Sequence, residues 1–321
     1  MRELAITETE SGGRLNKYLQ KYLSEASSGF IYKMLRKKNI ILNGVKADGS
    51  EILATGDVIK LFLSDETITK FSKSEQTPHA KPIKTVALSI VYEDAQVIMV
   101  NKPLNKLSQP DGRSKDSLIY DLHAYLKTPH NATFKPAIAN RLDRNTTGLV
   151  LCGKNLKSLQ ALNQMIHDRQ VDKYYVAIVH GRLTTKNVLK NYHEKDETKN
   201  RVNISSYPKP GYVEVVTEYE PLKIFDQYTY VKLQLITGKS HQLRAHMASI
   251  GHPIVGDTKY TGNRGSAQTI AKKYSIHSQL LHAHTIHIKC CAAPIDHLQG
   301  RSFTAELPKK FTIFLKSLEA Q

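Results

Sequence analysis

A short polar stretch that leads directly into an apolar run is the feature that most constrains this chain. Residues 139–149 read Ala-Asn-Arg-Leu-Asp-Arg-Asn-Thr-Thr-Gly-Leu and continue into the apolar segment 149–151. Such a run predicts a buried strand, so the polar residues before it form a turn at the end of that strand. Asp143 lies between Arg141 and Arg144, whose guanidinium groups favour its ionised form. The stretch predicts a carboxylate at the mouth of a buried strand, where catalytic groups often lie. The alternative is a structural aspartate in an arginine-rich turn.

The charge of the chain points to a polyanionic partner. Lys and Arg together number 46, against 29 Asp and Glu, which gives a formal net charge of +17 at pH 7. Nucleic acid is the usual partner of so basic a protein, although charge alone does not separate RNA from DNA or an anionic membrane. At 321 residues the chain is long enough for two domains, each with its own core.

Cysteine usage and hydropathy indicate a cytoplasmic protein. Cys152, Cys290 and Cys291 are too few and too poorly spaced for a zinc site or a disulfide framework, so we expect free thiols in a reducing compartment. The N-terminal segment is polar, unlike a signal peptide, and no apolar run approaches the roughly 20 residues of a membrane span. We therefore expect no membrane partner.

Residues 1–65 predict a compact unit of two helices followed by two strands. Apolar residues recur at helical spacing after Arg14 and again over 28–38, and strands are predicted at 40–42 and 58–63. A basic cluster gathers at the end of the second helix and consists of Lys33, Arg36, Lys37 and Lys38. It suits contacts to an RNA backbone, and an ordinary solvated helix face is an equal alternative.

Residues 66–84 are polar, contain two prolines and lack an apolar period, so they predict a linker to a larger domain over 85–321. In that domain, apolar segments predict strands at 88–94, 97–103, 149–152, 173–181, 212–219, 228–236, 280–288 and 302–307. Helical spacing predicts helices at 118–126 and 156–167, one after Ser240 and one at the C-terminus. Segment 184–211 is charged and weakly patterned, which indicates an extended surface segment available to RNA.

Two further motifs follow the Asp143 turn. Segment 173–181 reads Lys-Tyr-Tyr-Val-Ala-Ile-Val-His-Gly, a strand in which Tyr175 is by itself more typical of a core residue. Segment 237–247 reads Thr-Gly-Lys-Ser-His-Gln-Leu-Arg-Ala-His-Met and predicts a strand end, then a helix with Ser240 as its N-cap. The positive end of this helix and Arg244 can both face an anion.

No cofactor or metal site is indicated. His282 and His284 share a face of the strand at 280–288, but the pattern offers them no convincing carboxylate or thiolate partner. A glycine-rich loop of the kind that cradles nucleotide phosphates is also missing from the sequence. We expect neither a metal nor a nucleotide cofactor.

Together, these motifs resemble the RluA-type RNA pseudouridine synthases. The Asp143 turn resembles the family's H-R-L-D-x-x-T-S-G, with Asn140 and Thr147 in place of His and Ser. Segment 173–181 resembles K-x-Y-x-A-x-V-x-G, and segment 237–246 resembles T-G-R-x-H-Q-[IL]-R-x-H, with Lys239 in place of Arg. That replacement keeps the charge and loses the bidentate geometry. Residues 1–65 resemble the αL RNA-binding domain of a ribosomal small-subunit protein, including L-x-x-G-D-x-I at 53–59.

The resemblance implies an α+β fold in which a mixed, largely antiparallel sheet with a cleft along it is flanked by helices and preceded by the αL domain. It implies that Asp143 acts on the ribose, Arg244 pairs with Asp143, and Tyr175 stacks on the uracil. Arg141 would fill the gap left by a flipped nucleotide, or alternatively contact a surface phosphate. The further RNA contacts that we expect are Arg144, Lys239 and His241.

The expected function is isomerisation of specific uridines to pseudouridine, by a monomer, in large-subunit (23S) ribosomal RNA. Attack of the carboxylate at ribose carbon 1′ and a route through carbon 2′ both remain open. A synthase acting on tRNA and a catalytically silent RNA-binding or ribosome-assembly protein are alternatives. A base-removing N-glycosidase is another, and it would need a second carboxylate. Asp257 is the nearest candidate for that carboxylate, although its Gly-Asp setting indicates a structural residue.

Overall fold

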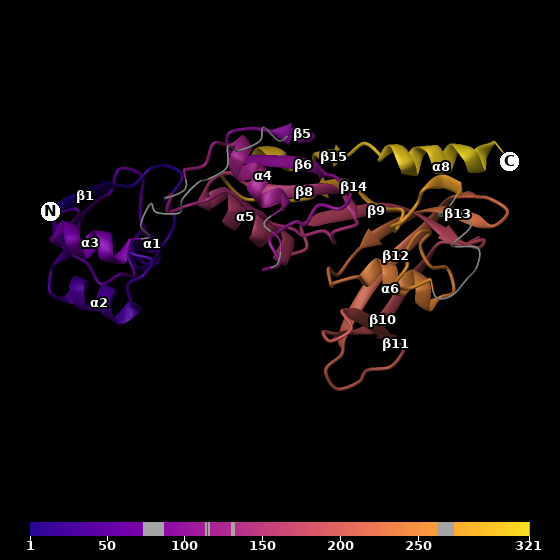
Figure 1. The fold of residues 1–321 in the computed structure, drawn as a ribbon, viewed down its shortest axis with the longest axis horizontal. Coiled ribbons are helices and arrows are strands. Elements are labelled where there is room, and N and C mark those ends of the chain that lie inside the picture. The colour runs from indigo at the N-terminus through magenta and orange to yellow at the C-terminus, as the bar shows by residue number, and fades with distance from the viewer. Residues whose placement is uncertain (73–86, 113, 115, 130–131, 262–272, 321) are drawn as a thin grey trace.

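The structure is a computed structural model that describes residues 1–72, 87–112, 114, 116–129, 132–261 and 273–320 (Figure 1). The N-terminal unit lies at one end of the elongated molecule. Its elements are β1 (Arg2–Ala5), α1 (Leu15–Tyr22), α2 (Ser28–Arg36), β2 (Ile40–Leu42), β3 (Val45–Lys46), β4 (Val58–Leu61) and α3 (Asp65–Phe71). The four strands form one antiparallel sheet in the order β1-β4-β2-β3.

The N-terminal unit has a hydrophobic core of its own, built by α1, α2 and the sheet. Leu15, Leu19, Ile31 and Ile59 are fully buried in it. The two helices and the strands β2 and β4 fall where the apolar spacing predicts them. The expected division of the chain into domains rests on this separate core and stays a prediction.

The helix α3 was not expected, because it lies at the start of the predicted linker. The Ser64 side chain accepts a hydrogen bond from the Thr67 amide and begins the helix. Ile68 is buried in the N-terminal core, and the Phe71 ring packs 4.5 Å from that of Phe30. Two apolar residues thus anchor a helix too short to show a period. Residues 73–84 of the predicted linker lie outside the described residues.

The rest of the chain forms one large sheet with helices. Its strands are β5 (Ile90–Glu93), β6 (Val97–Lys102), β7 (Ala137–Ile138), β8 (Thr147–Gly153), β9 (Val171–His180), β10 (Asn187–Asp196), β11 (Arg201–Ser205), β12 (Val213–Ile224), β13 (Tyr228–Leu235), β14 (Leu281–Ile288) and β15 (Ser302–Thr304). Its helices are α4 (Leu118–Tyr125), α5 (Leu156–His167), α6 (Gln242–Ser249), α8 (Lys309–Glu319) and the 3-10 helix η1 (Asp296–Leu298).

The large sheet has the order β11-β10-β12-β13-β9-β14-β8-β6-β5, with β15 on β14 and β7 on β8. All these pairs are antiparallel except β8 with β14. This confirms the expected α+β class with a mixed, largely antiparallel sheet. None of the helices in the described ranges is long and apolar enough to cross a membrane.

Strand β8, which follows the Asp143 turn, is buried on both faces. Val150 and Cys152 belong to the core that includes α4, whereas Leu149 and Leu151 belong to the core that includes α5. The sequence of a strand that is covered on both sides is a continuous apolar run rather than an alternation of apolar and polar residues. The prediction of a buried strand after the polar turn is therefore confirmed.

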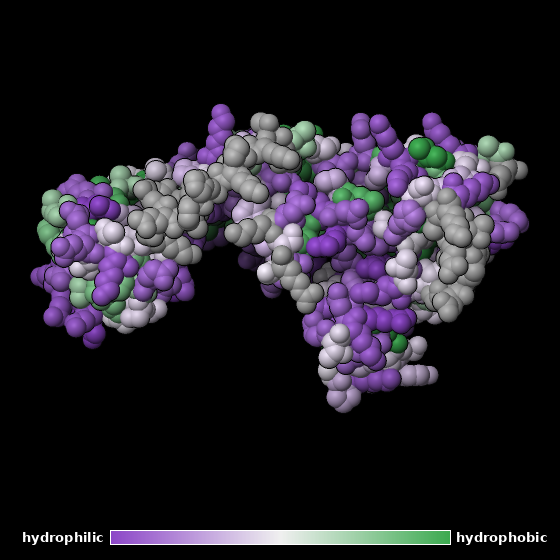
Figure 2. Space-filling model, viewed as in Figure 1, coloured by the Kyte–Doolittle hydropathy of each residue, from purple (hydrophilic) through white to green (hydrophobic). Residues whose placement is uncertain are grey.

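The segment 184–211, expected to be an extended surface segment, is more regular than its charges suggested. It forms the hairpin of β10 and β11, and β10 pairs along most of its length with β12. This hairpin projects from the body of the molecule (Figure 1), and most of its visible surface is hydrophilic (Figure 2). Because little of either strand is buried, the sequence has no apolar alternation there that would predict strands. The hairpin becomes evident only from the pairing of β10 with β12.

The parallel contact between β8 and β14 requires a glycine at position 148. Gly148 has a φ of +113°, and a Cβ placed there would lie 2.2 Å from the carbonyl oxygen of Ala283. The obstacle is backbone, which cannot turn aside as a flexible side chain would. The glycine of the Asp143 motif therefore allows β14 to approach the strand that carries the turn.

We expect Gly148→Ala to reduce the free energy of unfolding by about 3 kcal/mol or more, from backbone strain and overpacking together. Gly211→Ala is the matched control, because Gly211 also has a positive φ, of +81°, but nothing lies within 4 Å of its added Cβ. The control should lose only roughly 1–2 kcal/mol. Urea unfolding followed by circular dichroism measures both, and equal losses would contradict the steric argument.

Candidate active site

Asp143 lies on the turn between β7 and β8, and contacts from other segments fix the backbone on both sides of it. The Ser108 hydroxyl donates to the Leu142 carbonyl at 2.8 Å and accepts from the Leu142 amide at 3.0 Å. The Thr146 amide donates to the Asp143 carbonyl at 3.0 Å. These hydrogen bonds hold the turn in place and thereby fix the position from which the Asp143 side chain extends.

The same turn is held from β6 by a buried lysine. Lys102 is fully buried, and its Nζ donates to the carbonyls of Pro103, Lys106 and Arg144 at 3.2, 2.8 and 3.0 Å. Burial lowers the pKa of Lys102 to about 7. Three carbonyl acceptors satisfy its three donors and join two distant segments beside Asp143.

The two departures from the family's first motif keep hydrogen bonds to the sheet. Asn140 accepts from the Leu151 amide at 2.8 Å and donates to the Leu149 carbonyl at 3.2 Å, so its side chain continues the pairing along β8. The Thr147 hydroxyl lies 2.8 Å from Nδ1 of His282, whose Nε2 lies 3.3 Å from the Ala305 carbonyl. Since Nε2 donates to that carbonyl, Nδ1 accepts from Thr147. Both nitrogens of His282 are thus engaged in the protein.

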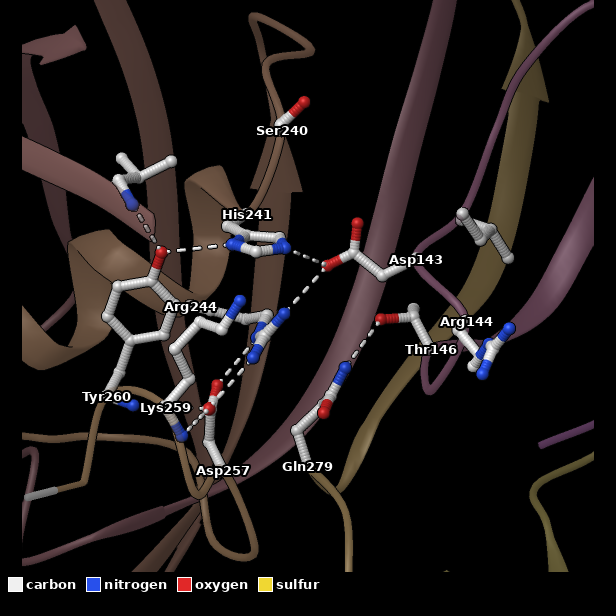
Figure 3. Close-up of polar contacts among 12 residues, drawn as sticks. Asp143, Arg144, Thr146, Ser240, His241, Arg244, Asp257, Lys259, Tyr260 and Gln279 are labelled. Carbon is white, nitrogen blue, oxygen red and sulfur yellow. Dashed lines mark hydrogen bonds and ion pairs between the residues drawn. The ribbon is translucent and has the colours of Figure 1, made fainter. Parts of the chain in front are cut away.

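Arg244 of α6 joins two carboxylates (Figure 3). Its Nε and Nη2 donate to Asp257 at 2.6 and 2.9 Å, and its Nη1 donates to Oδ2 of Asp143 at 3.0 Å. The Asp257 side chain is fully buried, whereas that of Asp143 is 29% exposed. Burial opposes the charge on Arg244, but the hydrogen bonds and charges of Asp257 and Asp143 raise its pKa. The exposed carboxylate is therefore oriented by a guanidinium that the buried one holds.

Helix α6 does not begin as predicted. Its N-cap is His241 rather than Ser240, with a φ of +52° and no side-chain capping hydrogen bond. The Gln242 side chain stabilises the turn instead, accepting from the Lys239 amide and the Thr237 hydroxyl at 3.1 and 2.9 Å. A side-chain amide thus holds the turn before the helix, and the helix itself has no side-chain cap.

Polar side chains also tie α6 to β12. The Gln242 amide donates to the Val216 carbonyl and the Thr217 hydroxyl, both at 3.0 Å. Nδ1 of His246 lies 2.8 Å from the same hydroxyl. These buried contacts set the rotation of the helix and thereby direct Arg244 toward Asp143.

Tyr175 of β9 lies on the Asp143 side of the sheet. Its side chain is buried in the core that includes α4, and burial together with the negative charge of Asp143 raises its pKa. The neighbouring Tyr174 points away, with Lys232 over its ring. Strand alternation therefore separates the two tyrosines as the sequence predicts.

The other predicted site residues lie in two places, one around Asp143 and His241 and the other on the N-terminal unit. His241 lies in the site, its side chain 10% exposed and its Nε2 3.7 Å from Oδ2 of Asp143. Arg141 and Lys239 are exposed, and each lies two residues before a residue of the site, Asp143 and His241 respectively. Arg144 is also exposed and pairs with Asp111 at 3.7 Å. The basic cluster Lys33, Arg36, Lys37 and Lys38 is exposed at the end of α2 in the N-terminal unit, which lies apart from β8 (Figure 1). The structure thus brings Asp143, Tyr175, His241 and Arg244 together.

Two further residues of the site carried no signal in the sequence. Tyr260 contacts His241, and Gln279 donates to the Thr146 hydroxyl at 3.3 Å. Neither belongs to a recognised motif, and only the folded chain reveals them. Asp257 belonged to a Gly-Asp pair that indicated a structural residue, and its burial against Arg244 fits that interpretation.

Comparisons with known proteins point in one direction. The sequence profile of a family described as RNA pseudouridylate synthase matches residues 96–249. The chain is 29% identical over 306 residues to "Ribosomal large subunit pseudouridine synthase D" of Borreliella burgdorferi, covering 93% of this chain and 89% of that protein. It is 27% identical over 285 residues to the Escherichia coli K12 protein of the same name, covering 87% and 83%.

Solved structures share the fold. Human RNA pseudouridylate synthase domain containing 4 superposes with a TM-score of 0.58 at 22% identity, covering 72% of this chain and 93% of that chain. Human RNA pseudouridylate synthase domain containing 1 gives 0.52 at 20% identity, covering 76% and 98%. At this identity the likeness concerns the fold.

The two carboxylates of Arg244 should differ in what they contribute to stability. We expect Asp257→Ala to cost about 3–5 kcal/mol of unfolding free energy, because it leaves a buried guanidinium without its main partner. Asp143→Ala, which removes a partly exposed carboxylate, should cost about 1 kcal/mol or less. Urea titration of both variants tests this, and a larger loss for Asp143→Ala would show that the assignment of structural and functional carboxylates is reversed.

Proposed function

We propose that this chain is an RluA-type RNA pseudouridine synthase, an isomerase, and that it converts specific uridines of large-subunit ribosomal RNA to pseudouridine with Asp143 as the catalytic carboxylate. The reaction breaks the bond between ribose carbon 1′ and uracil nitrogen 1, turns the base and forms a bond from carbon 1′ to carbon 5. The carbon 5 proton is then lost, and nitrogen 1, released from the ribose, gains one, so the product is an isomer of the substrate. Such a reaction needs a carboxylate at the sugar, and no water has to be activated.

The observation that carries the proposal is the setting of Asp143. Its carboxylate is partly exposed on a rigid turn, and its Oδ2 is held by Arg244 at 3.0 Å. A guanidinium at this distance forms a charge-assisted hydrogen bond that fixes the position of the carboxylate, as action on the ribose requires. Oδ1 has no partner among the residues that the structure describes, so one oxygen is available to the substrate.

The remaining roles follow from position. We propose that Tyr175, on the same side of the sheet, stacks on the target uracil. Exposed Arg141, two residues before Asp143, would occupy the gap that the flipped nucleotide leaves, and Arg144 and Lys239 would contact phosphates. The base must leave its stack to reach a carboxylate in the protein, which costs a few kcal/mol.

The substrate class rests on the relatives and on charge. The relatives described above are named for the large ribosomal subunit, and the chain spans more than four-fifths of each. The net charge of +17 and the basic cluster at the end of α2 suit a large RNA. A uridine in tRNA could be converted by the same reaction, and mapping of pseudouridine in both classes of RNA distinguishes the two substrates.

Base removal by hydrolysis is less well supported. Glycoside hydrolysis normally uses two carboxylates. Asp257, the nearest candidate for the second, is fully buried with both oxygens bonded to Arg244. It therefore cannot reach a substrate as an acid or a base.

Asp143→Asn should abolish turnover and leave RNA affinity nearly unchanged, because it removes the charge and keeps the shape. Carbodiimide-based mapping of pseudouridine in ribosomal and transfer RNA, in cells lacking the gene and rescued with either form, measures this. A site that returns with wild type and stays absent with the variant identifies both activity and substrate. Rescue by Asp143→Asn would contradict the catalytic assignment, and persistence of every site without the gene would favour a silent RNA-binding protein.

The basic cluster at the end of α2 should contribute to the salt dependence of RNA binding. Replacing Lys33, Lys37 and Lys38 by Ala should weaken binding and reduce the slope of log K against log salt by roughly 0.7–0.9 for each phosphate that the variant no longer neutralises. The control replaces the exposed lysines of α8 at the other end of the molecule, Lys309, Lys310 and Lys316, with the same change in net charge. Equal slopes for the two triple variants would contradict a specific role of α2 in binding RNA.

A further inference from the structure

The sequence predicts an RNA contact for His241, but the structure places its side chain between Asp143 and Tyr260 (Figure 3). Its backbone has a φ of +52°, a left-handed conformation that is unfavourable for a residue with a Cβ. The side chain makes no capping hydrogen bond in return. A strained residue at a functional site suggests that the position of its side chain matters.

The hydrogen bonds of Tyr260 define which nitrogen of His241 carries the proton. The Tyr260 hydroxyl oxygen accepts from the Val202 amide at 2.8 Å, and it lies 3.0 Å from Nδ1 of His241. The amide can only donate, so the hydroxyl keeps its own proton to give. Among the described residues, Nδ1 is the acceptor within reach. A neutral ring that accepts at Nδ1 carries its proton on Nε2.

The ring is neutral because of where it lies. Burial lowers the pKa of His241 to about 4, with Arg244 and Lys259 acting in the same direction and Asp143 and Asp257 opposing. Arg244 already supplies a full positive charge to Asp143. A neutral N–H donor can therefore help to orient the Asp143 carboxylate without placing a second positive charge beside it.

Both contacts to Asp143 end on the same oxygen. Nη1 of Arg244 lies 3.0 Å and Nε2 of His241 lies 3.7 Å from Oδ2. The longer distance exceeds a hydrogen bond, but such contacts are often loose before substrate binds and tighten in the complex. Two donors on one oxygen fix the rotation of the carboxylate and leave the other oxygen for reaction.

We propose that His241 is a positioning residue: with RNA bound, its Nε2–H donates to Oδ2 of Asp143, Tyr260 fixes the tautomer that makes this possible, and Oδ1 is the oxygen that acts on the ribose. The inference rests on the proposed function in taking Asp143 as the catalytic carboxylate. The link extends to the β10–β11 hairpin, because Val202 of β11 provides the amide that orients Tyr260.

Tyr260→Phe tests the link with least disturbance. The ring keeps its edge contact with His241, at 5.8 Å between centroids, and its packing against Arg201 and Arg244, and only the hydroxyl is removed. We expect kcat to fall roughly 10- to 100-fold, the scale of a small misplacement of a catalytic group, with KM for the RNA unchanged. The control is Tyr219→Phe, which removes a hydroxyl from a buried tyrosine of β12. An unchanged kcat in Tyr260→Phe would overturn the proposal.

Two substitutions of His241 separate positioning from a merely structural role. Asn adopts the left-handed conformation more readily than Gln, but only the longer Gln side chain can place an amide N–H near the position of Nε2. Positioning predicts that His241→Gln retains more kcat than His241→Asn, whereas a role in the turn alone predicts the reverse order.

The tautomer can be measured without any substrate. Long-range 1H–15N correlation spectra of protein labelled in its histidine nitrogens should show His241 protonated on Nε2 at neutral pH, with its signals assigned by their disappearance in His241→Asn. Tyr260→Phe should shift that ring toward a mixture of tautomers. A ring protonated on Nδ1, or on both nitrogens, would overturn the proposal. Wild-type protein that converts no uridine would instead count against the proposed function, and the spectra would still decide the tautomer.

Discussion

One guanidinium shared by two unequally buried carboxylates organises the site. Arg244 donates twice to buried Asp257 and once to partly exposed Asp143. A buried ion pair contributes little net stability, because desolvation offsets attraction, but it fixes geometry when its hydrogen bonds are satisfied. Asp257 thus fixes Arg244, and Arg244 can then hold Asp143 at a set distance without being pulled out toward solvent.

The rest of the fold brings the two sides of this interaction together. Asp143 comes from the turn before β8, a strand buried on both faces, and Lys102 of β6 holds the carbonyls around that turn. Arg244 comes from α6, which Gln242 and His246 tie to β12. Gly148 lets β14 lie against β8 at the end of the turn that carries Asp143.

Local pattern predicted the secondary structure wherever apolar spacing was strong and failed where it was weak. The helix α5 has the predicted bounds, and the apolar runs that became β6 and β8 begin and end within two residues of the prediction. The hairpin of β10 and β11 was missed because partners distant in sequence stabilise it, and α3 because two turns are too short for a period. The predicted N-cap Ser240 failed because Gln242, reaching back along the chain, stabilises that turn instead.

The sequence by itself indicated the family resemblance, determined the fold class and located the residues that the family's motifs align, since each of these depends on short contiguous segments. Tertiary structure alone decided which partners those residues meet. That Asp257 takes two of the donors of Arg244, that Tyr260 fixes the proton of His241, and that Oδ1 of Asp143 is left open depend on side chains far apart in the chain. Hydrogen bonds require positions accurate to a few tenths of an ångström, which no spacing of residue types along a chain specifies.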